Sequence, residues 1–142
     1  MKFTNENGQE ISLKRSATLP GYEVTLAEDT VIDSAVNNPF FKGINILQLP
    51  KKLKGFRDNP DLNMLFTPQV IKINIKVEIS DSQIVIFQPK FNLVNNLKIQ
   101  MVNQIFTNGE VINPSFINLG LHKINLKKNT VIGDILILNV FN

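Results

Sequence analysis

Residues 71–79 of this 142-residue chain alternate strictly: the odd positions are isoleucine or valine, and the even positions are lysine, asparagine or glutamate. A period of two puts every apolar side chain on one face of an extended strand. The turn formers Ser80, Asp81 and Ser82 follow, and residues 84–87 are again apolar. The pattern predicts a half-buried strand over 71–79 and a hairpin whose return strand covers 84–87.

The same period recurs toward the C-terminus. Residues 97–102 alternate, and residues 135–141 are almost continuously apolar, which indicates a strand buried on both faces or shared with another subunit. A further alternating stretch has its apolar positions at Ile117, Leu119, Leu121, Ile124 and Leu126.

Helical signals are scarce. No segment carries an apolar stripe of period 3.6 over three turns, and the best helical candidate is the short stretch after Asp33, which Pro39 ends. Short strands separated by Asn, Gly, Pro and Asp turns predict an all-β sandwich or barrel with little helix.

Composition removes several classes of site. The chain has no cysteine and a single histidine, so disulfides, thiolate ligands, thiol nucleophiles and two-histidine metal sites are excluded. A net charge of +3 is too small a surplus to make nucleic acid the expected partner. The N-terminus has no apolar h-region and no run of 18 apolar residues occurs, so we expect neither a signal peptide nor a membrane span. The predicted location is intracellular or within a larger particle.

Residues 37–68 form a segment of different character, rich in proline and without alternation apart from a short stretch. We therefore expect one domain over residues 1–142 with a long loop insertion at about 37–68. The insertion holds a basic cluster beside three phenylalanines, which is interpreted first as a solvated loop and second as a binding patch. The cluster and its neighbours are Lys51, Lys52, Lys54, Arg57, Phe40, Phe41 and Phe56.

Four segments resemble, in chain order, the motifs of the trimeric dUTPase family. Residues 14–29 are similar to the first motif, a Gly-Tyr-Asp-Leu segment followed by alanine and acidic residues. Residues 73–93 resemble the hairpin leading into Pro-Arg-Ser-Gly-Leu, residues 97–116 the strand and Gly-Val-Ile-Asp-x-Asp-Tyr turn, and residues 127–137 the Gly-Asp-Arg-Ile-Ala-Gln motif. The resemblance implies a distorted β-barrel of the dUTPase-like, or β-clip, type, in which three chains assemble and each active site draws on all three.

The sequence departs from this family at the positions that carry its chemistry. Lys90 and Phe91 stand where the family has arginine and serine, so the phosphate-contacting hydroxyl is lost and only a charge is kept. Asn113 occupies the position of the water-activating aspartate and has no carboxylate to accept a proton. Phe116 replaces the tyrosine beneath the deoxyribose, a change expected to preserve the stacking face.

Further departures affect the remaining motifs. Ser115 replaces the other aspartate, Asn118 replaces a glycine, and Asp134 places a negative charge where the family has glutamine near a polyphosphate. The glycine-rich fifth motif with its arginine has no counterpart before Asn142. Glu23 is the one carboxylate kept for magnesium, and a single carboxylate is a poor site, so no metal and no cofactor are expected.

Other candidate sites favour structural interpretations. His122 has no partner at a catalytic spacing and is interpreted as a surface or turn residue. Asn108-Gly109 predicts a tight turn, and Gly133 predicts a bulge or a close backbone approach rather than a phosphate cradle. Three acidic residues are interpreted as solvated loop residues rather than a glycosidase pair: Glu28, Asp29 and Asp33.

The sequence therefore predicts a non-enzymatic structural protein without catalytic, cofactor-binding or metal residues. We expect a homotrimeric virion component, a capsid decoration or auxiliary protein of a phage or virus, found in the virion or the host cytoplasm. The 37–68 loop is expected to contact other structural proteins of the assembly. Two alternatives remain open: a weak dUTP-binding or dUTP-hydrolysing protein that uses Glu23, Lys90 and Phe116, and a nucleic-acid-binding module that uses the basic cluster.

Overall fold

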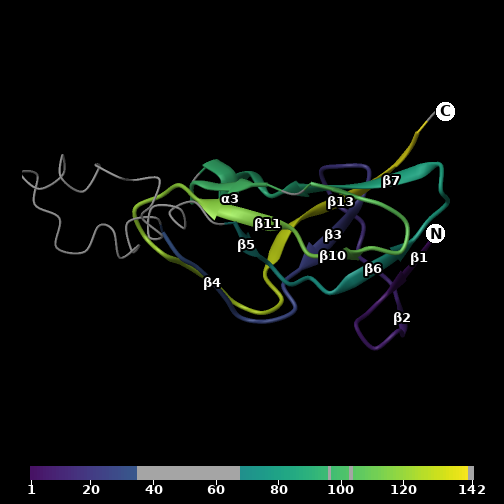
Figure 1. Ribbon diagram of the computed structural model, residues 1–142, viewed down its shortest axis with the longest axis horizontal. Coiled ribbons are helices and arrows are strands. Elements are labelled where there is room, and N and C mark those ends of the chain that lie inside the picture. Colours follow the sequence, from purple (N-terminus) through teal and green to yellow (C-terminus); the bar gives the residue numbers. More distant parts are fainter. Residues whose placement is uncertain (35–67, 96, 103, 141–142) are drawn as a thin grey trace, which may run out of the picture.

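Strands supply nearly all the regular structure of the computed structural model, which describes residues 1–34, 68–95, 97–102 and 104–140 (Figure 1). The one helix of these residues is α3 (Phe91–Asn95), and within them no helix has the length and apolarity to cross a membrane. The strands are β1 (Lys2–Thr4), β2 (Glu10–Ile11), β3 (Tyr22–Thr25), β4 (Thr30–Ile32), β5 (Gln69–Val70), β6 (Ile75–Glu78), β7 (Gln83–Pro89), β8 (Ile99–Met101), β9 (Ile105–Phe106), β10 (Val111–Ile112), β11 (Ser115–Asn118), β12 (Ile124–Leu126) and β13 (Val131–Asn139). The all-β prediction with little helix is confirmed.

Two predictions fall outside the described residues. The helix expected after Asp33 and the basic cluster of the 37–68 insertion both belong to residues 35–67. The insertion therefore stays a prediction, as does the single-domain organisation that includes it.

The strands form four antiparallel sheets. One has the order β3-β13-β7-β9, and a second has the order β10-β6-β1-β2; the smaller ones are β5-β11-β8 and β12-β4. The longest strand, β13, is central: it pairs with β3 on one side and with β7 on the other. Its first half is buried on both faces, whereas Leu138 and Val140 are exposed beyond it. The apolar C-terminal segment is thus a central strand with a partly exposed end.

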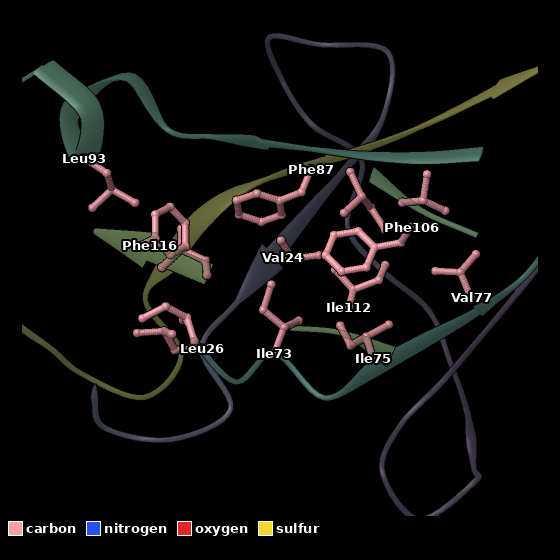
Figure 2. Close-up of a cluster of buried hydrophobic side chains, with 14 of the residues drawn as sticks. Val24, Leu26, Ile73, Ile75, Val77, Phe87, Leu93, Phe106, Ile112 and Phe116 are labelled. Atoms are coloured by element: carbon pink, nitrogen blue, oxygen red, sulfur yellow. The ribbon is translucent and has the colours of Figure 1, made fainter. Parts of the chain in front are cut away.

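The core lies between the sheets and is almost wholly aliphatic and phenylalanine (Figure 2). Val85, Phe87 and Ile135 point into it from the β7–β13 pair, and each is fully buried. Val77 and Ile112 face them from the sheet that contains β6 and β10. Because alternate residues of each strand point inward, apolar residues at a period of two fill one continuous core.

The strand predicted over 71–79 is shorter than its pattern. Every odd residue of this stretch is buried, as the alternation predicts, but strand pairing begins only at Ile75. Asn74 has a φ of 58°, a left-handed conformation that asparagine tolerates and that interrupts an extended strand. Alternation therefore identified the buried face correctly and the strand's start incorrectly.

The predicted hairpin between 71–79 and 84–87 is wrong. The strands β6 and β7 lie in different sheets: β6 pairs with β1 and β10, and β7 pairs with β13 and β9. Just after β6, the Ile79 N–H donates to Asn108 Oδ1 at 2.9 Å, and the chain then passes into the sheet that contains β7 and β13. Both segments bury one apolar face, and facing sheets satisfy that pattern as well as a hairpin does.

In the alternating stretch that begins at Ile117, the last two apolar positions are confirmed, because Ile124 and Leu126 lie in β12 and pack, partly buried, against the core. The first positions need correction. Phe116 and Asn118 are buried there, the opposite phase, and the exposed fractions of Leu119 and Leu121 are 55% and 72%. The strand ends at Asn118 because its side chain closes a turn: Nδ2 donates to the His122 carbonyl, and Oδ1 accepts from the Gly120 N–H, both at 2.8 Å.

Candidate functional site

Three residues that the sequence assigned to separate motifs lie together in the structure. Glu23 on β3 and Asp134 on β13 are direct cross-strand partners. Lys90 follows the end of β7, and its backbone N–H donates to the Ile132 carbonyl at 2.9 Å. Its Nζ atom lies 3.3 Å from Asp134 Oδ2, 3.4 Å from Asp134 Oδ1 and 3.9 Å from Glu23 Oε1. We call Glu23, Lys90 and Asp134 the ion-pair cluster.

Burial makes the ion-pair cluster costly to disturb. Asp134 is only 2% exposed, and in the described residues the ammonium of Lys90 is the charged group that contacts it. A buried carboxylate is stable only when it is paired. Lys14, which is largely exposed, lies 3.7 Å from the other oxygen of Glu23. The two carboxylates of the cluster are thus neutralised by the ammonium groups of Lys90 and Lys14. No positive charge of the cluster is left unpaired for a phosphate.

The ion-pair cluster does not fit a magnesium ion, the metal that a dUTPase-like site would take. Each carboxylate already faces an ammonium group, so a divalent cation would have to displace Lys90 from between Glu23 and Asp134. Within the described residues, no group of three or more His, Asp or Glu side chains could hold a metal.

Two glycines allow the backbones around the ion-pair cluster to approach closely. A Cβ atom on Gly133 would lie 2.5 Å from the Gln88 carbonyl oxygen and 2.6 Å from the Phe87 ring, and one on Gly21 would lie 2.2 Å from the Ile135 carbonyl oxygen. The register of β13 against β3 also shifts between Val131 and Gly133. The bulge or close approach predicted for Gly133 is confirmed, and it sets the position of Asp134.

Asn113, which the resemblance matches to the water-activating aspartate of trimeric dUTPases, makes structural hydrogen bonds here. Its Oδ1 accepts hydrogen bonds from the backbone N–H groups of Ile73 and Asn74, both at 2.9 Å. Its Nδ2 donates to Asn74 Oδ1 at 3.3 Å. These bonds hold the left-handed residue at which the 71–79 segment bends, so the carboxamide is already committed to the fold.

Phe116 does not present a stacking face, and the expectation that it does is wrong. It is 2% exposed, and its ring packs edge-on against Phe87 with centroids 6.1 Å apart (Figure 2). Ser115 before it is half-buried in β11, and Asn118 is buried by the turn described above. The residues matched to the third motif therefore belong to the core and its turns.

Phe91, at the position of the family's serine, is the most exposed apolar residue near the ion-pair cluster, at 78%. It begins α3 and lines a groove of about 650 Å³ on the outer face of β7 and β13. Lys90 and Asp134 lie at this groove as well, and Leu19, Ile86 and Leu136 line it. The groove beside the ion-pair cluster is thus mainly apolar.

The remaining candidate residues are exposed or lie in turns, as expected for residues without a catalytic role. His122 is exposed, and so are the three loop acids Glu28, Asp29 and Asp33. Asn108 and Gly109 form the predicted turn, in which Gly109 has a φ of 81°. Sequence reasoning missed Lys14 and Asn74, because their importance comes from long-range contacts that no local pattern signals.

Comparison with known proteins identifies the fold. No protein-family model matches the sequence, and no curated protein matches it. Solved structures do match over nearly the whole chain. The dUTPase of Streptococcus mutans has a TM-score of 0.64 at 12% identity, covering 100% of this chain and 98% of that one. The dUTPase of Staphylococcus bacteriophage 80alpha has a TM-score of 0.66 at 10% identity, covering 99% of this chain and 90% of that one.

The chain has a dUTPase-like fold. The prediction of that fold from four short segments is confirmed, since structures of two dUTPases align with almost all of the chain. At 10–12% identity the similarity extends to the fold alone. Any activity of the dUTPase-like fold in this chain must be argued from its own side chains.

Proposed function

We propose that this chain is a dUTPase-like protein without hydrolytic activity that serves as a structural component of a phage or viral particle. The proposal rests on the hydrogen bonds that the Asn113 side chain makes. A general base needs a free acceptor that takes up a proton, and this carboxamide oxygen accepts two backbone N–H groups instead. Loss of a general base alone lowers a rate by about 10² to 10⁴.

The charges of the ion-pair cluster support the same proposal. A triphosphate needs excess positive charge, and here the ammonium of Lys90 is held between Asp134 and Glu23. Asp134 would face a phosphate as a like charge, which is unfavourable at short range. The chain therefore has the fold of nucleotide hydrolases, but its ion-pair cluster leaves no positive charge free to bind a phosphate.

A particle-bound homotrimer is the form we propose for this role, as one domain over residues 1–142 whose 37–68 insertion contacts neighbouring proteins. The resemblance to the trimeric dUTPase family supports a trimer, and the exposed apolar side chains of Leu138 in β13 and Val140 just beyond it support a subunit contact there. Similarity to a phage dUTPase supports a phage or viral setting. Mass spectrometry of purified particles tests this: the chain should be present at a fixed copy number, and its restriction to a free cytosolic pool would contradict the proposal.

A weak dUTP-binding or dUTP-hydrolysing protein is the second candidate, because the two solved structures compared above are dUTPases. Titration calorimetry with dUTP and magnesium, together with a pyrophosphate-release assay, separates the two proposals. We expect no saturable heat in the micromolar range and no pyrophosphate above the background of a protein-free control. Micromolar binding or enzyme-dependent pyrophosphate release would establish the second candidate and overturn the first.

A nucleic-acid-binding role is the least supported candidate, and one experiment tests it. A gel shift with single-stranded and double-stranded DNA at low salt should show no complex. A salt-sensitive shift that disappears when Lys51, Lys52 and Lys54 are all changed to glutamate would establish this role.

A further inference from the structure

The strand β8 has one edge that no strand of the described residues covers. On its other edge it pairs with β11, where the Val102 N–H donates to the Ser115 carbonyl and the Leu119 N–H donates to the Lys98 carbonyl. Bonded residues alternate along an antiparallel pair. Residues 98, 100 and 102 therefore direct their backbone groups toward β11, whereas Ile99 and Met101 direct theirs away from it. An uncovered edge of this kind can accept another strand.

A groove of about 790 Å³ runs along β8. Four consecutive residues of this segment, 98–101, line it; Val94 of α3 and residues 119–122 complete the wall. Leu119 and Leu121 lie there with more than half of their surface exposed. We call this the β8 groove. It combines open backbone groups with apolar side chains, the two features that bind an extended peptide.

The charged lining of the β8 groove has one sign. Its charged or titratable members are Lys98 and His122, and the groove of about 450 Å³ that continues from it along residues 120–126 adds Lys123. Among the residues that the structure describes, neither lining contains a carboxylate. A two-fold contact between identical copies would set this cationic surface against itself, which is unfavourable. An occupant with carboxylates is favoured instead.

We propose that the β8 groove binds an extended segment of a partner protein in which apolar residues alternate with acidic ones. The segment adds to β8 as a further antiparallel or parallel strand and exchanges hydrogen bonds with Ile99 and Met101. Its apolar side chains contact Leu119 and Leu121, and its carboxylates face Lys98 and Lys123. The proposal goes beyond the structural role above and does not depend on it, because the β8 groove shares no residue with the ion-pair cluster or with Asn113.

Nuclear magnetic resonance of the full chain tests the proposal, with a blocked peptide of alternating valine and glutamate, long enough for one strand, as the probe. We expect saturable shifts of the Ile99 and Met101 amide signals and of the signals of residues 119–122, with slower hydrogen exchange at Ile99 and Met101. The matched control peptide of alternating valine and lysine should cause no shifts at the same concentration.

Variants of exposed residues locate the binding. Leu121→Asp should weaken the binding of the glutamate peptide by about tenfold, since it removes an apolar contact and adds a like charge. Val111→Asp, at another exposed apolar residue, on β10, should leave the affinity unchanged. Lys98→Glu should reverse the preference between the two peptides.

Three results would overturn the proposal. The first is the absence of saturable shifts at millimolar peptide, and the second is a set of shifts centred away from β8. The third is a fall in the mass of the protein itself on Leu121→Asp, which would identify the β8 groove as a contact between copies of this chain. None of these results bears on the dUTP titration, so the two proposals fail separately.

Discussion

Lys90 Nζ lies 3.3 and 3.4 Å from the two carboxylate oxygens of Asp134, a residue that is almost completely buried. The resemblance in the sequence matches these residues to an arginine and a glutamine of the trimeric dUTPase family. A buried carboxylate at the second position requires a positive partner, and the lysine at the first position supplies it. The ammonium group of Lys90 is therefore the counter-ion of a buried carboxylate.

Replacing Lys90 by methionine should therefore destabilise the fold. The variant leaves the Asp134 carboxylate buried without its ammonium partner, and we expect a loss of about 1–3 kcal/mol in the free energy of unfolding. Urea denaturation followed by circular dichroism measures it. Lys14→Met is the matched control: Lys14 is largely exposed beside Glu23, and its loss should change stability by about 0.5 kcal/mol or less.

The double variant Lys90→Met with Asp134→Asn completes this test. Removing the buried charge together with its partner should recover most of the lost stability, because the amide needs no counter-ion. Equal losses from Lys90→Met and Lys14→Met would show that the ion pair contributes nothing to folding.

Changes at Asn113 should affect stability and leave hydrolysis absent. Asn113→Ala removes the acceptor for the Ile73 and Asn74 N–H groups, at an expected cost of about 1–3 kcal/mol. Asn113→Asp restores the family's carboxylate, but that carboxylate would accept the same two N–H groups. We expect no pyrophosphate release from dUTP by this variant. Ser115→Ala on the neighbouring strand serves as the control for both measurements, and turnover by Asn113→Asp would show that the site lacks only its base.

Much of the fold could be predicted from the sequence, because a strand with one buried face shows a local alternation of apolar and polar residues. The odd residues of 71–79 are all buried, as their alternation predicts. No local pattern shows which strands pair with one another: β6 and β7 are adjacent in the chain and lie in different sheets. The left-handed Asn74 that shortens the first strand is held by Asn113, 39 residues away, and local periodicity contains no information about that contact.

The candidate site was predicted in part. Motif order brought Glu23, Lys90 and Asp134 into consideration, and the structure places them together. The sequence does not show that Phe116 is buried, because a substitution of tyrosine by phenylalanine looks conservative, whereas the ring's exposure depends on how β11 faces the core. Nor does it show which residues around Ile117 face the core, since Asn118 is buried by hydrogen bonds that only the folded turn provides.

The mass of the protein in solution tests the proposed assembly. Light scattering should give three times the 16.0 kDa chain mass. If the exposed end of β13 lies in the subunit contact, Leu138→Asp places a charge in an apolar interface and should produce monomers. Val111→Asp on β10 is the control and should leave the trimer intact. A monomeric wild-type chain would contradict the assembly.

Any side chain at Gly133 should destabilise the fold, because two groups of β7 occupy the space that a methyl group needs. A Cβ atom there would lie 2.5 Å from the Gln88 carbonyl oxygen, which β-sheet pairing holds in place, and 2.6 Å from the buried Phe87 ring. We expect Gly133→Ala to cost about 1–3 kcal/mol in urea denaturation, as overpacking of a core does. Gly109→Ala is the control, since a Cβ there meets nothing nearer than Lys76 Cε at 3.8 Å and the cost comes from its positive φ alone, about 1 kcal/mol. A smaller loss at Gly133 than at Gly109 would mean that β7 and β13 can separate locally, and Asp134 would then not be fixed beside Lys90.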